Sequence, residues 1–89
     1  MLIPIRVQTF GYARGDEASE RPTELCEVTL VASPDVLRII SQHLLEAAAR
    51  MQRDPTFGHL HLRDQWPGWT EADADVIVTH GYRTEQPGT

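Results

Sequence analysis

Two histidines stand one residue apart in the segment FGHLHLRDQW, residues 57–66, where His59 and His61 flank Leu60. Imidazole nitrogens ligate Zn²⁺ and other transition metals, so a pair at this spacing could hold a metal ion. A closed zinc site needs further ligands, for which the sequence offers Glu27, Asp64 and His80. The alternative is that both histidines are solvated or interface side chains on the polar side of a strand.

The neighbouring leucines favour the second interpretation. Successive side chains of a strand point to opposite faces. If Leu60 and Leu62 face the core, then His59, His61 and Arg63 all point to the uncovered face. We therefore predict a partner-binding role for these three residues and keep a metal site on the two histidines as the alternative.

The tryptophans Trp66 and Trp69 flank a Pro-Gly turn directly after this segment. Tryptophan and arginine dominate the energetic centres of protein interfaces, so both indoles join Arg63 in the predicted partner-binding surface. Indole N–H groups find an acceptor when they are buried, and we expect at least one to donate to a backbone carbonyl.

Other chemistries find little support in the sequence. All eight basic residues are arginine, and the absence of lysine excludes Schiff-base chemistry and a P-loop. Cys26 is expected on the inward face of a strand and Ser33 to cap a helix. His43 is expected on the helix flank as a packed or snorkelling side chain rather than a ligand. No G-x-S-x-G or H-E-x-x-H motif is present. We predict a non-enzymatic protein with no catalytic residues and no cofactor.

The composition of the chain excludes some classes of binding partner. The net charge of -5 argues against nucleic-acid binding, because phosphate contacts require clustered basic residues. No stretch approaches the roughly 20 apolar residues of a membrane span. A lone cysteine and the lack of a signal-peptide pattern indicate a cytoplasmic protein. The absence of lysine and asparagine, whose codons are AT-rich, suggests a bacterial source with GC-rich DNA.

Four strands and one helix are expected to position these residues. Alternating apolar and polar residues predict strands over 1–10, 24–32, 57–64 and 75–79, with a long hairpin connection over 11–23. Ser33-Pro34-Asp35 starts a helix of about 20 residues, and Asp54-Pro55 ends it. The fold class is α+β: a β-β-α-β-β order giving a four-stranded, mostly antiparallel sheet with one helix packed on one face.

The apolar spacing also predicts which residues face inward. The helix is expected to bury the stripe Leu37, Ile40, Leu44, Ala48 and Met51, and the second strand to bury Cys26, Val28, Leu30 and Ala32. Residues 1–81 are interpreted as one domain and 82–89 as a polar C-terminal tail. Because one helix covers only one face of the sheet, the other face is polar or is buried by a partner, which leaves a homodimer as an open alternative.

The run LRIISQHLLEAAARM over Leu37–Met51, followed by FGHLHLRDQW and DVIV, resembles the Imm32-like group of small bacterial immunity proteins. The resemblance covers Leu37 to Val78, and its most specific residues are Phe57, His59, His61, Leu62 and Asp64. It implies a protein that neutralises a toxin by binding it in the cytoplasm, without catalytic residues or a cofactor. An acidic chain would complement a basic toxin such as a nuclease.

Overall fold

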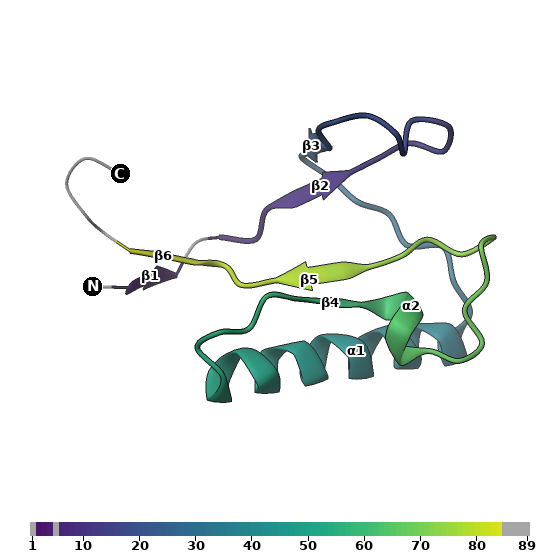
Figure 1. Ribbon diagram of the computed structural model, residues 1–89. Helices are drawn as coiled ribbons and strands as arrows, with labels where there is room; N and C mark the ends of the chain where they lie inside the picture. Colours follow the sequence, from purple (N-terminus) through teal and green to yellow (C-terminus); the bar gives the residue numbers. More distant parts are fainter. Residues whose placement is uncertain (1, 5, 85–89) are drawn as a thin grey trace. The chain divides into compact units, whose positions relative to one another are not determined.

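The computed structural model describes residues 2–4 and 6–84. Eight short elements follow one another along these residues (Figure 1), in the order β1 (Leu2–Pro4), β2 (Thr9–Gly11), β3 (Thr23–Leu25), α1 (Pro34–Arg53), β4 (His59–His61), α2 (Leu62–Gln65), β5 (Ile77–Thr79) and β6 (Tyr82–Thr84). They belong to two compact units: the terminal unit, with residues 1–31 and 81–89, and the helical unit, Ala32–His80. The predicted α+β class is confirmed.

The predicted four-stranded sheet is not formed by the described residues. Their strands pair two by two instead, as β1 with β6, β2 with β3, and β4 with β5, and every pair is antiparallel. Each strand is only three residues long, at the short end of the usual range. Residues 82–84, which we expected in a polar tail, form β6, and residues 85–89 of that tail lie outside the described residues. The single domain over 1–81 stays a prediction.

The terminal unit contains the predicted hairpin. Phe10 of β2 lies opposite Glu24 of β3, and the connection between the strands includes Gly15 at a positive φ of 95°. Only glycine adopts that backbone angle without steric cost. The strand predicted over 1–10 is divided into β1 and β2, and the parts of that prediction on residues 1 and 5 lie outside the described residues.

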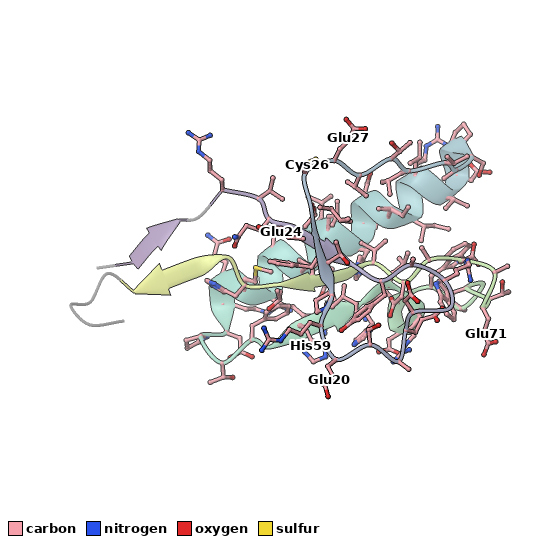
Figure 2. All side chains as sticks on the ribbon, turned by 90° about the horizontal axis from the view of Figure 1, so that it is seen from above. Glu20, Glu24, Cys26, Glu27, His59 and Glu71 are labelled. Atoms are coloured by element: carbon pink, nitrogen blue, oxygen red, sulfur yellow. The ribbon has the colours of Figure 1, made fainter. Side chains whose placement is uncertain are left out.

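The predicted burial of the second strand is wrong. β3 ends at Leu25, and Figure 2 shows Cys26 and Glu27 on the extended segment that leads from β3 to α1. Cys26 is exposed, as are Val28 (58%) and Leu30 (52%). Alternation tells which side chains share a face, but burial also requires a partner strand, and β2 reaches no further than the residue opposite Leu25.

The helix α1 begins and ends as the sequence predicts. The Ser33 hydroxyl accepts a hydrogen bond from the Val36 amide at 3.3 Å, and Pro34 occupies the first helical position. At the other end the Asp54 amide donates to the Arg50 carbonyl, and the Asp54 carboxylate accepts from the Thr56 amide at 2.9 Å. The caps therefore satisfy backbone groups that a helix terminus leaves unpaired.

The buried face of α1 differs from the predicted stripe. Ile40 of the predicted stripe is buried, but its buried neighbours are His43 and Ala47, whereas Leu37 and Leu44 are 41% and 47% exposed. The spacing of 40, 43 and 47 satisfies the helical period as well as the spacing of 37, 44 and 48 does, so periodicity could not choose between two adjoining stripes. The choice follows from a partner: His43 Nε2 donates to the Val76 carbonyl at 2.7 Å.

The core of the helical unit lies between α1 and the β4–β5 ladder. Helix α1 runs beside this ladder and packs against β5 and α2 (Figure 1). Leu60 and Leu62 are 6% and 2% exposed, which confirms that both leucines face inward. Neither helix of the described chain has the length and hydropathy that crossing a bilayer requires.

Candidate functional site

The strand predicted over 57–64 is shorter than expected because it turns into a helix. β4 ends at His61, and α2 begins at Leu62, whose amide still donates to the Val76 carbonyl at 3.0 Å. The next amide, that of Arg63, donates to the Asp75 carboxylate at 3.2 Å rather than to a strand carbonyl. The Arg63 amide belongs to the first turn of α2, where a helix leaves its amides unpaired, and the Asp75 carboxylate satisfies it.

Asp75 joins two of the predicted site residues. His61 Nδ1 lies 2.6 Å from one carboxylate oxygen of Asp75, and Arg63 Nε lies 3.7 Å from the same oxygen. His59 contacts the other histidine ring edge to face, with ring centroids 4.9 Å apart. We call His59, His61, Arg63 and Asp75 the histidine–aspartate cluster.

The side chains of the cluster differ in how far they are exposed to solvent. His59, labelled in Figure 2, is exposed, the His61 side chain is 20% exposed and the Asp75 side chain 17%. Arg63 is 53% exposed, so its guanidinium reaches solvent while its backbone amide is tied to Asp75. The outward orientation predicted for the histidines holds fully for His59 and partly for His61, which leans onto the carboxylate.

The protonation of the cluster follows from its contacts. Burial raises the pKa of Asp75, but the hydrogen bond from His61 and that from the Arg63 amide outweigh it, and the pKa lies below its ordinary value of 3.8. Asp75 is therefore ionised at neutral pH and can only accept hydrogen bonds. Consequently Nδ1 of His61 carries the hydrogen, and in the neutral ring Nε2 keeps a lone pair.

A closed metal site is not present among residues 2–4 and 6–84. Within those ranges no three His, Cys, Asp or Glu side chains are placed to hold one ion. Within the helical unit neither Asp64 nor His80, both suggested as further ligands, thus completes a set with the two histidines. Asp75 approaches His61 as a hydrogen-bond acceptor.

The two tryptophans fall into different environments. The Trp69 indole N–H donates to the Ala74 carbonyl at 3.0 Å, which confirms that at least one indole finds a backbone acceptor. Trp66 is half-buried and lines a groove between α1 and the turn that follows α2. Gly68 is required beside it, because a Cβ there would lie 2.7 Å from the Trp66 indole nitrogen.

This α1 groove has a volume of about 510 Å³. Trp66 and Pro67 line the groove from the turn after α2. On the opposite side, α1 contributes four polar side chains spaced four residues apart: Arg38, Gln42, Glu46 and Arg50. Residues at this spacing lie on one side of a helix. Arg50 donates to the Glu46 carboxylate at 2.8 Å and thereby lowers its pKa, so the wall presents paired charges.

The structure thus brings together three of the five predicted partner-binding residues, His59, His61 and Arg63, and adds two features that sequence reasoning missed. Asp75 could have been found from the register: since His61 lies opposite Ile77, the next outward position of β5 faces Arg63. The sequence indicated the α1 groove only weakly, through the four-residue spacing of polar residues on α1. Nothing in the sequence showed that Trp66 would lie opposite these residues.

These features define a small α+β protein with one long helix on a two-stranded ladder, a polar cluster and an adjoining groove. The family model described as Immunity protein 32 matches residues 27–81, more than half of the 89 residues. The chain belongs to this family, and the resemblance over Leu37 to Val78 is confirmed. It is therefore an immunity-type protein. Comparison with curated proteins gave no match, and comparison with solved structures gave none either.

Proposed function

We propose that this protein neutralises a toxin by binding it directly in the cytoplasm, without catalysing a reaction. The observation that carries the proposal is membership of the Immunity protein 32 family over residues 27–81, the segment that contains the helical unit. The exposed side chains of that unit supply groups suited to recognising a protein.

The contact surface in this proposal comprises the histidine–aspartate cluster and the mouth of the α1 groove. Arg63 lies within α2 and Trp66 directly follows it as the C-cap, so this turn connects the cluster to the groove. Both are residue types that carry binding energy in protein interfaces. Trp69 contributes by holding the loop 70–74 through its bond to Ala74.

Asp75 prepares this surface for binding. It holds the His61 ring and the Arg63 amide before a partner arrives, so little conformational entropy remains to be lost on association. The Arg63 guanidinium, 53% exposed, remains accessible to a carboxylate or carbonyl of the partner. At longer range the net charge of -5 favours encounter with a basic toxin.

The experiment begins with the reading frames that flank this gene. Each is expressed under a repressible promoter with and without this chain, and any frame whose toxicity is relieved is purified and titrated against the chain by calorimetry. We expect rescue of growth together with a 1:1 complex. Rescue without a complex, or no rescue from any neighbouring frame across several genomes, would contradict the proposal.

Two variants locate the surface. Truncating an interface anchor typically costs about 2 kcal/mol, so Arg63→Ala or Trp66→Ala should weaken the complex more than tenfold. Arg53→Ala is the matched control, because Arg53 is 64% exposed at the end of α1 and its ion pair with Glu46 is long, at 3.6 Å. Equal weakening by Arg63→Ala and Arg53→Ala would exclude the proposed surface.

A further inference from the structure

Two imidazoles project from the same side of β4. Leu60 points into the core between them, so His59 and His61 both lie on the outer side. Their ring centroids are 4.9 Å apart, and the ring planes are inclined at 74°.

The centroid separation is that of two imidazoles on one ion. A Zn–N bond of about 2.05 Å places a ring centroid roughly 3.2 Å from the metal, and two such rings at a tetrahedral angle have centroids about 5.2 Å apart. The observed 4.9 Å corresponds to a slightly smaller angle at the metal. The separation of the two rings is therefore compatible with both coordinating one ion once a nitrogen of each ring turns toward it.

Asp75 supplies the outer partner that metal-binding histidines usually have. Its carboxylate lies 2.6 Å from His61 Nδ1, which fixes the Nδ1–H tautomer and leaves Nε2 as the nitrogen available to a metal. A hydrogen bond to a carboxylate also makes the imidazole a stronger donor to a metal.

We propose that His59 and His61 form an open, two-imidazole site for a borderline divalent transition metal such as Zn²⁺, with Asp75 as a positioning residue. No further His, Cys, Asp or Glu side chain of the described segments joins the pair as a ligand. The remaining coordination positions of the ion are filled by water in the isolated protein. Imidazole ligands select Zn²⁺, Ni²⁺ and Cu²⁺ and discriminate against Mg²⁺ and Ca²⁺.

The test is calorimetric titration of the chelator-stripped full chain with ZnCl₂, and separately with MgCl₂. We expect one Zn²⁺ per chain and no heat with Mg²⁺. His59→Ala and His61→Ala should each weaken Zn²⁺ binding at least tenfold. His80→Ala is the matched control: His80 follows β5 in the same unit and should leave the affinity unchanged. Absence of Zn²⁺ binding, or equal weakening by His80→Ala, would overturn the proposal.

The positioning role of Asp75 must be tested with a measurement that a general loss of stability would not change. Asp75→Asn, shown to be folded by circular dichroism, should weaken Zn²⁺ binding about tenfold or more, the usual effect of losing such an outer partner. Nitrogen-15 NMR of the metal-free variant should show His61 shifting away from the Nδ1–H tautomer. An unchanged affinity with an unchanged tautomer would remove Asp75 from the site. The inference is independent of toxin binding, because it is measured on the isolated chain.

Discussion

Replacing Asp75 with asparagine keeps the shape of the side chain and removes its charge. The carboxylate accepts from His61 Nδ1 at 2.6 Å and from the Arg63 amide at 3.2 Å, and a guanidinium nitrogen of Arg63 lies 3.7 Å away. Asparagine offers one acceptor oxygen, so its NH₂ group must face one of these two donors. If the NH₂ group faces His61, the ring moves its hydrogen to Nε2 so that Nδ1 can accept. The variant therefore turns both charge-assisted hydrogen bonds into neutral ones.

The magnitude follows from these two changes. Hydrogen bonds to a charged group contribute about 1.5–3 kcal/mol each and neutral ones about 1 kcal/mol. The Asp75 side chain is 17% exposed, so part of the gain is offset by the desolvation of the carboxylate. We expect Asp75→Asn to lower the free energy of unfolding by about 2 kcal/mol at neutral pH. That is a large share of the roughly 4–13 kcal/mol expected for a chain of this length.

The difference between wild type and Asp75→Asn should depend on pH. Burial raises the pKa of Asp75, but the hydrogen bonds from His61 and Arg63 bring it below 3.8 in the folded protein. Because the folded-state pKa lies below the unfolded one, ionised Asp75 stabilises the fold fully well above pH 3.8. That stabilisation is lost as the pH falls through the folded-state value. The difference in the free energy of unfolding between wild type and Asp75→Asn should be largest at about pH 6 and should shrink progressively below about pH 4.

The assay is urea unfolding followed by tryptophan fluorescence, at about pH 6 and about pH 3. With a urea m-value of about 1 kcal/mol/M for a small domain, the midpoint should fall by roughly 2 M at the higher pH. Asp64→Asn is the control, because it removes an exposed carboxylate within α2 and should change stability by less than about 0.5 kcal/mol. An unchanged midpoint at pH 6, or the same gap at both pH values, would refute this account of Asp75.

Three further predictions concern the helical unit, and all are measured by urea unfolding. His43→Ala should destabilise by about 2–3 kcal/mol, because it empties a buried site and removes the hydrogen bond to the Val76 carbonyl. His43→Leu loses the same hydrogen bond but fills the volume and removes the buried, unpartnered Nδ1 of the ring, so it should cost only about 1 kcal/mol. Equal losses from the two variants would contradict this reasoning. Gly68→Ala should displace the Trp66 indole, which should lower the free energy of unfolding by about 1–2 kcal/mol and alter the fluorescence of the folded state. Gly58→Ala is its control and should have neither effect, because the added Cβ meets nothing within 4 Å. Ser33→Ala should cost about 1 kcal/mol through loss of the α1 cap, and Ser33→Asp should restore most of it.

Local signals in the sequence account for the parts of the structure that were predicted well. The limits of α1 follow from Ser33, Pro34 and Asp54, because each acts on backbone groups within a few residues of itself. The inward orientation of Leu60 and Leu62 follows from their hydrophobicity beside polar neighbours. The Immunity protein 32 family was likewise recognisable from Leu37 to Val78.

Contacts between distant segments decided the rest. Periodicity on α1 allowed two adjoining stripes, and the hydrogen bond to the Val76 carbonyl accompanies burial of the one that contains His43. The strand predicted over 57–64 ends at His61, because the chain turns into α2 at Leu62, where Asp75 accepts from the Arg63 amide. Alternation likewise could not tell that β3 would lack a ladder partner beyond Leu25.

By itself, then, the sequence determined where α1 starts and stops, that His59 faces outward, and to which family the chain belongs. Only the tertiary structure decided which face of α1 is buried and that Asp75 holds His61 and Arg63. The physical reason is the distance along the chain over which each interaction acts. Caps and hydrophobicity act over neighbouring residues, whereas a hydrogen bond between residues 12 to 33 positions apart exists only once the fold has brought them together.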